Sequence, residues 1–215
     1  MRRTFGSVTN EPVTDGRRAR RQRSRIAIID AAFSLILGGK GQPSTEQIAE
    51  RAAVSVSSIF RNFDGLDDMQ QQVLDRFREH YAHLLLATPP EGSDVDDRVA
   101  FFVRLRLDLY EQAGPLLMTA RMRALYDDTW IEPIDRNRSL LAAQTRACLA
   151  PEISERTPST AADLVALVDS IMSPEVYDLM TKFHARSRRQ LSGSWTHALR
   201  SLITSPVTTP EGAAS

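Results

Sequence analysis

The sequence predicts an all-α fold of about nine helices, with a small N-terminal helix-turn-helix bundle and a larger C-terminal bundle. Apolar residues recur at helical spacing along most of the 215 residues, and glycine or proline separates these patterns. No strand-like alternation follows the linker at residues 87–94. A hydrophobic content of 42% provides enough apolar side chains for a core.

Composition favours a cytoplasmic protein with no membrane partner. No apolar run approaches the roughly 18 residues that a membrane helix needs, and the first 16 residues lack the apolar stretch of a secretory signal. Cys148 is the single cysteine, which excludes an intramolecular disulfide and a cysteine-based metal site.

The net charge of zero hides an asymmetry between the two ends of the chain. Residues 1–63 carry 11 Lys and Arg against 5 Asp and Glu, whereas residues 64–215 carry 16 against 22. A basic N-terminal part favours a polyanionic partner for that part alone. An ordinary solvated basic tail is the alternative interpretation.

The N-terminal third predicts a disordered tail followed by three helices. We expect disorder over residues 1–16 and a first helix over about 20–37, ended by glycines. Ser44 with Gln47 forms a capping box at the start of the second helix. Ser55 is an N-cap candidate for a third helix of about two turns.

The rest of the chain predicts one long connecting helix and a set of C-terminal helices. The connecting helix covers about 67–87, and the linker ATPPEGSD ends it. In the C-terminal part we expect Gly114-Pro115 to end one helix and Pro174 to interrupt another. The further helices are expected over about 116–126, 129–149, 161–185 and 189–204.

The stretch IAERAAVSVSSIFRNF, at residues 48–63, combines two short helices with a tight turn. This is a helix-turn-helix, whose second helix enters the DNA major groove by its N-terminal residues. Small side chains there permit close approach, and serine hydroxyls and free N–H groups bind phosphates. Arg61 and Asn62 are long enough to reach bases or backbone. The alternative is a surface hairpin that binds nothing.

Residues 20–75 resemble the DNA-binding domain of the TetR family of bacterial transcriptional regulators. The resemblance rests on an arginine-led helix with IIDAAFSLI, a glycine loop, a capping serine, IAERA, a VS turn, the SIFRNF motif and a long fourth helix. Residues 88–215 resemble the family more weakly, through helix count and the segments LVDSIMSPEVYDLM and SWTHALRSLI. The resemblance implies an all-α homodimer that binds double-stranded DNA and whose C-terminal domain binds a small effector.

The resemblance also implies a domain organisation and a set of DNA contacts. Residues 17–66 form the DNA-binding domain, 67–87 the connecting helix and 88–205 the effector-binding and dimerisation domain, between disordered tails at 1–16 and 206–215. The residues placed at DNA are Ser44, Thr45, Ser55, Val56, Ser57, Ser58, Phe60, Arg61 and Asn62.

Three positions depart from the family pattern. Ala53 replaces a usual glycine, Phe60 a tyrosine that contacts the DNA backbone, and Leu66 a lysine that grips phosphate. A positive φ at Ala53 would cost roughly 1 kcal/mol. We expect a basic arm, of the kind that enters a minor groove, to replace the lost electrostatic grip, and its residues are Arg20, Arg21 and Arg23.

Aromatic and methionine residues in the C-terminal part favour an adaptable apolar pocket, although any one of them also suits a core. One inward-facing arginine among Arg104, Arg106 and Arg121 would favour an anionic or carbonyl-bearing effector, and a solvated helix face is the alternative. The effector-binding candidates are Phe102, Leu105, Tyr110, Met118, Arg121, Met122, Tyr126 and Trp130.

The last two helices carry more apolar surface than one bundle needs, which favours a two-fold dimer interface. Its candidate residues are Leu164, Leu167, Val168, Ile171, Leu179, Trp195, Leu199 and Leu202.

No pattern predicts catalysis, a metal or a cofactor. His80 and His83 lie three residues apart on one helix, but nothing nominates further ligands. The stretch GGKGQPS follows a helix and lacks the Lys-Ser/Thr ending of a phosphate-binding loop.

Together these patterns predict a homodimeric transcriptional regulator, in its simplest form a repressor of a palindromic operator that a small effector releases. An activator is compatible with the same patterns. Two further classes of protein also fit them: a DNA-binding architectural protein without an effector, and an all-α ligand carrier or enzyme with an incidental N-terminal bundle.

Overall fold

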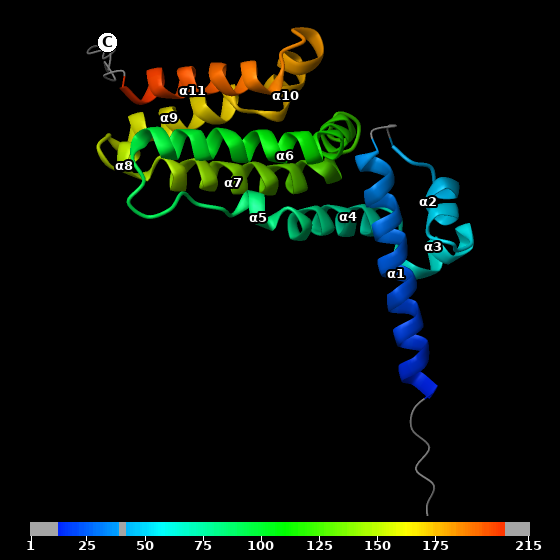
Figure 1. The fold of residues 1–215 in the computed structure, drawn as a ribbon. Helices are drawn as coiled ribbons and strands as arrows, with labels where there is room; N and C mark the ends of the chain where they lie inside the picture. Colours follow the sequence, from blue (N-terminus) through cyan, green and yellow to red (C-terminus); the bar gives the residue numbers. More distant parts are fainter. Residues whose placement is uncertain (1–12, 39–41, 205–215) are drawn as a thin grey trace, which may run out of the picture.

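The structure, a computed structural model, describes residues 13–38 and 42–204, and every regular element in these ranges is a helix (Figure 1). The predicted all-α fold, with an N-terminal helix-turn-helix and a larger C-terminal domain, is confirmed. Most of the two predicted tails and two of the helix-ending glycines lie outside the described residues.

The N-terminal unit consists of α1 (Val13–Leu37), α2 (Thr45–Arg51) and α3 (Val56–Asn62), and α4 (Leu66–His80) packs against α1. α1 begins at Val13, so the prediction of disorder up to residue 16 is wrong for its last four residues. The arginine-rich stretch has no helix breaker before Gly38 other than Gly16, and the helix runs through it.

Two serine caps begin the helices of this unit, as the sequence predicts. The Ser44 Oγ accepts from the Gln47 N–H at 3.3 Å, and the Gln47 Oε1 accepts from the Ser44 N–H at 2.8 Å. The Ser55 Oγ accepts from the Ser58 N–H at 3.3 Å. Ala53, between the two helices, has a φ of +54°, so the strained turn predicted there is present.

The connecting segment is two helices rather than the predicted one, because α4 stops at Tyr81 and α5 (Ala82–Leu85) follows. The Tyr81 side chain is buried, packs against Phe33 and Phe77, and donates from its hydroxyl to the Gln112 carbonyl at 3.2 Å. The break therefore coincides with an anchor that joins α1, α4 and α6.

α6 (Val95–Ala124) continues as one helix through Gly114-Pro115, so the prediction that this pair ends a helix is wrong. A proline inside a helix removes one hydrogen bond and costs roughly 3 kcal/mol. Gly114 has no Cβ to clash with the proline ring, and buried side chains on both sides, from Val99 to Ala120, hold the helix in place.

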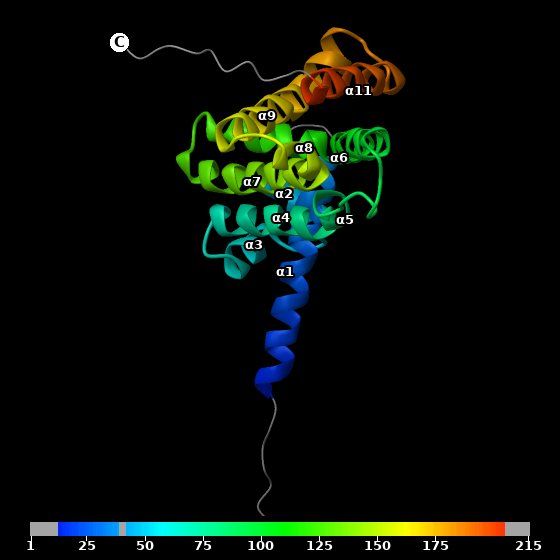
Figure 2. The ribbon, with the colours of Figure 1, turned by 90° about the vertical axis from the view of Figure 1, so that its left-hand side faces the viewer.

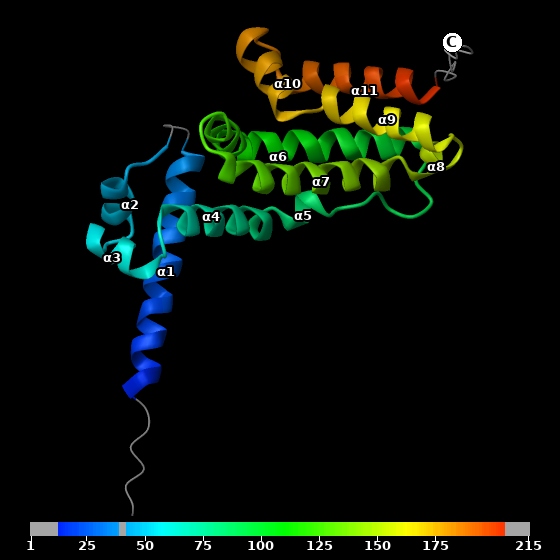
Figure 3. The same ribbon diagram turned by 180° about the vertical axis from the view of Figure 1, so that it is seen from behind.

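The C-terminal helices form two further layers above α4 and α5, with α6 and α7 in the middle and α9 and α11 outermost (Figure 3). The predicted interruption at Pro174 is confirmed, because Ser173 caps a new helix there. Pro151 lies inside the first turn of a short helix instead of only ending its predecessor. The elements are η1 (Asp128–Trp130), α7 (Ile131–Cys148), α8 (Ala150–Ser154), α9 (Pro158–Ile171), α10 (Pro174–Asp178), the π-turn η2 (Leu179–Phe183) and α11 (Arg188–Thr204).

These interruptions explain why the structure has more helices than the nine predicted. None of the described helices combines the length and the apolar character that a membrane span requires.

Candidate nucleic-acid interface and internal cavity

The N-terminal end of α3 carries a cluster of serine hydroxyls. The Ser55 Oγ lies 3.0 Å from the Ser57 Oγ and 2.8 Å from the Ser58 Oγ, and the Arg61 Nη2 donates to the Ser58 Oγ at 2.9 Å. Ser55, Ser57 and Arg61 are exposed. A helix N-terminus with exposed hydroxyls and a nearby guanidinium has the donors that phosphate oxygens and base edges accept.

Three predicted contact residues on α3 differ in how far they reach. The Phe60 ring is 56% exposed and lies on the outer face, where it offers only van der Waals contact. Val56 is half-buried against the core. Asn62 is 7% exposed and donates from Nδ2 to the Ser58 carbonyl at 2.7 Å. The prediction that Asn62 reaches toward DNA is therefore wrong for this conformation, because the helical turn directs its side chain inward.

The start of α2 presents the remaining predicted contacts. Ser44 is exposed but its hydroxyl and N–H are already used in the capping box, and Thr45 is half-buried. These two residues therefore present a polar surface next to the turn.

Arg25 fixes α3 against α1 and α4, a role that no sequence pattern predicted. Its guanidinium donates to the Asn62 carbonyl at 2.7 Å, to the Gln72 Oε1 at 2.8 Å and to both Asp68 oxygens at 3.0 and 3.1 Å. It also lies 4.8 Å from the centre of the Phe63 ring. One signal could have found it, since Arg25 shares a helix face with the fully buried Ile28 three residues later.

Asp68 completes this clamp as a carboxylate. Partial burial raises its pKa, but the Asp64 N–H at 3.1 Å, the Gln72 amide at 2.6 Å and the Arg25 guanidinium together outweigh burial. The pKa of Asp68 therefore lies below its usual value, and the clamp stays ionised at neutral pH.

The predicted basic arm is helical. Arg20, Arg21 and Arg23 are exposed, and they belong to the N-terminal part of α1, which projects beyond α2 and α3 and away from the rest of the molecule (Figures 1 and 2). Arg17 and Arg18 on the same projecting part are exposed as well.

A cavity of about 570 Å³ opens between α6, α7, α9 and α10. Of the eight predicted effector-binding residues, only Tyr110 and Arg121 line it. Phe102, Leu105 and Trp130 are buried, Met118 is half-buried outside the lining, and Met122 and Tyr126 are exposed. Those predictions are wrong for this cavity, because composition alone does not tell which side of α6 faces it.

The cavity also has a wall that composition did not nominate. Its further lining residues are Arg106, Leu117, Ala120, Ile134, Asn137, Arg138, Ser139, Leu141, Ala142, Asp169, Ser170, Ser173, Pro174 and Glu175.

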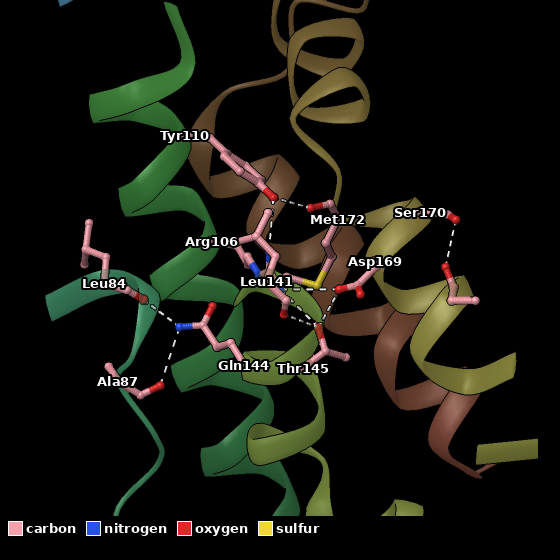
Figure 4. A network of polar contacts seen from close by, with 11 residues as sticks. Leu84, Ala87, Arg106, Tyr110, Leu141, Gln144, Thr145, Asp169, Ser170 and Met172 are labelled. Carbon is pink, nitrogen blue, oxygen red and sulfur yellow. Dashed lines mark hydrogen bonds and ion pairs between the residues drawn. The ribbon is translucent and has the colours of Figure 1, made fainter. Parts of the chain in front are cut away.

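Arg106 is the inward-facing arginine of α6, with 1% of its surface exposed. Its Nη2 donates to the Leu141 carbonyl at 2.6 Å, to the Thr145 hydroxyl at 3.0 Å and to the Asp169 Oδ1 at 3.4 Å (Figure 4). The Thr145 hydroxyl donates to the same Asp169 oxygen at 2.5 Å. The Arg106 Nε is buried with no hydrogen-bond partner, so the wall keeps one unused donor.

Tyr110 lies one turn further along α6 in the same wall. Its hydroxyl donates to the Met172 carbonyl at 2.7 Å, and burial raises the pKa of the hydroxyl, so it stays protonated (Figure 4). The cavity wall is therefore a set of fixed polar groups among apolar side chains, which is the usual make-up of a small-molecule site.

Two contacts join α7, which contributes to this wall, to the segment that leads to the helix-turn-helix. The Arg78 Nη1 on α4 donates to the Asn137 Oδ1 of the lining at 3.4 Å. The Gln144 amide on α7 donates to the Leu84 carbonyl at 2.5 Å, within α5 (Figure 4). Hydrogen bonds therefore join α7 to both α4 and α5.

The predicted dimer residues divide between the interior and the surface. Leu164, Val168, Trp195 and Leu199 are buried in the chain's own core, so the prediction that they form an interface is wrong. Leu167 is 50% exposed, Leu179 is similarly exposed, and Ile171 and Leu202 are half-buried. α9 and α11 are apolar on their inner faces because they cover α6 and α7, a use that apolar content alone does not distinguish from dimerisation.

The fold is that of known transcriptional regulators. EbrR, a multidrug-binding protein solved with imidazole, superposes with a TM-score of 0.59 at 23% identity over 88% of this chain and 97% of EbrR. A transcriptional regulator from Rhodococcus sp. Rha1 gives 0.65 at 16% identity, over 88% of this chain and 99% of that protein.

A Rhodococcus protein assigned to the TetR family gives a TM-score of 0.59 at 16% identity over 85% of this chain and all of that chain. By sequence, no protein-family model and no curated protein matches. The chain therefore shares the fold of TetR-family regulators at low identity, and the resemblance found in the sequence extends through both domains of the structure.

Proposed function

We propose that the protein is a DNA-binding transcriptional regulator that acts as a homodimer and responds to a small-molecule effector. The main support for this proposal is the exposed surface at the N-terminal end of α3. It presents Ser55, Ser57 and Arg61 outward while Arg25 holds the helix from behind. The projecting arginines of α1 lie on the same part of the molecule and supply positive charge for a phosphate backbone.

A homodimer supplies the geometry that a palindromic operator requires. Two α3 helices must lie about one helical turn of DNA apart, ~34 Å, to enter successive major grooves. The exposed Leu167 and Leu179 on the outermost layer support an interface built from α9 and the α10–η2 region. Replacing Leu167 by arginine should then yield monomers in sedimentation experiments and remove tight operator binding.

The effector site of this proposal is the cavity of about 570 Å³. Arg106 and Tyr110 offer fixed polar groups to a ligand, and EbrR, a protein of the same fold, is a multidrug-binding protein. The Arg78–Asn137 contact leads from the cavity wall to α4. A ligand changes DNA affinity here only by its different affinities for two positions of α4. Release of a repressor is the simplest outcome, and activation is the second.

Fluorescence anisotropy on DNA segments tiled across the protein's own upstream region tests the proposal. We expect tight binding to one palindromic segment, and at least about a tenfold loss for Arg61→Ala. Arg146→Ala is the matched control, because Arg146 is exposed on α7 and its loss changes the net charge equally. Equal binding to all segments would favour an architectural protein, and no binding even at low salt would favour a carrier or enzyme.

The basic arm has its own test in the salt dependence of binding. Each phosphate contact contributes about 0.9 to the slope of log affinity against log salt concentration. Replacing Arg20, Arg21 and Arg23 by glutamine should lower the magnitude of that slope by the contribution of about two to three phosphate contacts. An unchanged slope would contradict a role for the arm.

A further inference from the structure

A second cavity, of about 310 Å³, lies at the junction between the helix-turn-helix unit and the C-terminal domain. One side of it comes from α1, the start of α2 and α4, through residues such as Ile36, Ile48 and Met69. The other side comes from α6 and η1, through Leu116, Thr119 and Trp130. No pattern in the sequence predicted this junction cavity.

The junction cavity and the larger cavity lie back to back. They share Ala120 as a lining residue. Ala120 belongs to a small cluster with Leu74, Trp130 and Ile134 that is separate from the main core. Leu74 and Trp130 face the junction cavity, while Ile134 faces the larger one. A single layer of side chains therefore separates the two spaces.

The two cavities differ in their chemistry. The larger one has Arg106, Arg121, Arg138, Asp169 and Glu175 in its wall, whereas none of the described residues that line the junction cavity carries a charge. An ionic ligand would lose its hydration on entering the junction cavity and would find no charged partner there. This transfer costs a large amount of free energy. The junction cavity therefore suits an uncharged and mostly apolar molecule.

One polar group at the junction cavity could orient a bound ligand. Gln70 on α4 is a lining residue, and its Oε1 is buried with no hydrogen-bond partner. A buried acceptor without a partner is costly, and a donor on a ligand removes that cost. The hydroxyl of Thr119 does not serve this purpose, because it donates to the Pro115 carbonyl at 2.8 Å.

We propose that the junction cavity is a second ligand site, and that it binds a small uncharged alcohol or phenol whose hydroxyl donates to the Gln70 Oε1. A volume of about 310 Å³ lies at the lower end of small-molecule sites, which suits a ligand of about ten non-hydrogen atoms.

Occupancy of the junction cavity is linked to DNA binding. The lining includes Ser44 and Thr45 at the start of α2 and Leu66 at the start of α4, and it also includes Leu116 on α6. A ligand held between these residues favours the spacing of the two domains that accommodates it. This linkage rests on the proposed function, whereas binding to the cavity does not.

The two tryptophans make binding at the two cavities distinguishable. Trp130 lines the junction cavity, and Trp195 packs against Tyr110, which lines the larger cavity, with 6.3 Å between their ring centres. Full-length protein labelled with 5-fluorotryptophan should show two ¹⁹F resonances, which Trp130→Phe and Trp195→Phe assign. The probes are 4-ethylphenol and its methyl ether, which lacks the hydroxyl donor.

We expect 4-ethylphenol to shift the Trp130 resonance in a saturable way and to leave the Trp195 resonance in place. The methyl ether should bind at least tenfold more weakly. Gln70→Leu should lower the affinity for 4-ethylphenol to that for the methyl ether and leave the affinity for the ether unchanged, because only the phenol donates to the amide oxygen. The proposal is overturned if 4-ethylphenol shifts only the Trp195 resonance in a saturable way, or if it shifts neither resonance up to millimolar concentration. It is also overturned if the Gln70→Leu variant still binds 4-ethylphenol more tightly than the methyl ether by the full original factor.

Two cavity-filling variants control for general destabilisation. Thr119→Leu adds bulk to the junction cavity and should abolish the Trp130 shift, whereas Ala142→Leu adds bulk to the larger cavity and should preserve it. Thermal unfolding of both variants shows that each is folded. Loss of the Trp130 shift in Ala142→Leu but not in Thr119→Leu would contradict the assigned site.

The linkage to DNA has a separate readout. If 4-ethylphenol changes operator affinity by some factor, operator must change 4-ethylphenol affinity by the same factor. We expect at least a threefold change in both measurements. A saturable Trp130 shift without any change in operator affinity would overturn the linkage, and failure to find an operator would count against the proposed function and leave the ¹⁹F result intact.

Discussion

The helix-turn-helix unit and the C-terminal domain use arginine in opposite ways. The N-terminal unit exposes the arginines of its projecting helix and Arg61, and among its described arginines only Arg25 turns inward. The C-terminal domain encloses Arg106 completely and surrounds it with a carboxylate, a hydroxyl and a carbonyl. Exposed guanidinium groups are available to a partner, whereas buried ones must use their donors within the chain to offset the loss of water.

The two inward-facing arginines also differ from each other. Arg25 joins three helices at a partly exposed surface, so water still reaches part of its guanidinium. Arg106 joins α6, α7 and α9 in the interior and forms part of a cavity wall. The difference predicts that Arg106 matters most for stability, while Arg25 matters for the position of α3.

Arg106→Ala should give the largest loss of stability. The substitution leaves Asp169 near a cavity without its cationic partner, and removing one partner of a buried pair costs about 3–5 kcal/mol in the free energy of unfolding. Urea unfolding followed by circular dichroism measures it. Arg106→Met removes the charge but keeps a side chain that packs against Phe102. Comparing it with Arg106→Ala separates the effect of lost volume from the effect of lost charge. A loss below about 1 kcal/mol would mean that the charge is not needed in the wall.

Arg25→Ala should cost about 2 kcal/mol, because it removes three partly buried hydrogen-bonded contacts at once. The matched control is Arg23→Ala, two residues away and exposed, which should change stability by at most about 0.5 kcal/mol. Under the proposed function both variants bind operator more weakly, for different reasons. Equal stability of the two variants would contradict the role assigned to Arg25.

Ala53→Gly should stabilise the protein by about 1 kcal/mol, since the φ of +54° suits glycine and strains alanine. Ala52→Gly is the neighbouring control. Ala52 has a φ of −83°, and glycine there should destabilise by about 0.5–1 kcal/mol. Thermal unfolding of both variants shows whether each substitution stabilises or destabilises the protein. Destabilisation by Ala53→Gly would show that the turn carries no relievable strain.

The smallest expected effect is the pH dependence from Asp68. Its pKa in the folded protein is below the unfolded value of about 3.9. Its contribution to stability is therefore complete well above pH 4 and is lost as the pH falls through the folded pKa. Urea midpoints measured from pH 7 to pH 3 should fall less steeply at the acidic end for Asp68→Asn. Parallel curves for the two proteins would contradict an ionised Asp68 in the clamp.

The local rules of the sequence predicted the helix-turn-helix well. Ser44, Gln47 and Ser55 cap their helices as expected, and Ala53 adopts the positive φ that its place in the turn implies. These features depend on residues at most a few positions apart, so the chain itself carries the information. The inward turn of Asn62 and the clamp by Arg25 were missed because both depend on contacts between helices.

The C-terminal domain was predicted in outline and missed in detail. Gly114-Pro115 has the local signature of a helix end, yet α6 continues because side chains on both sides of it pack into the core. Effector candidates on α6 divide among core, surface and cavity, since a shift of one residue turns a side chain by about 100° around the helix axis.

The sequence by itself determined that the chain is all-α, where its capped helices begin, and that its basic part lies at one end. Only the tertiary structure decided which arginine is exposed and which is enclosed, which leucines of α9 and α11 cover the core, and that two cavities lie back to back across Ala120. Caps and periodicity arise from interactions between neighbours in the chain. Cavities and clamps arise where helices far apart in sequence meet, and their positions depend on the packing of every helix at once.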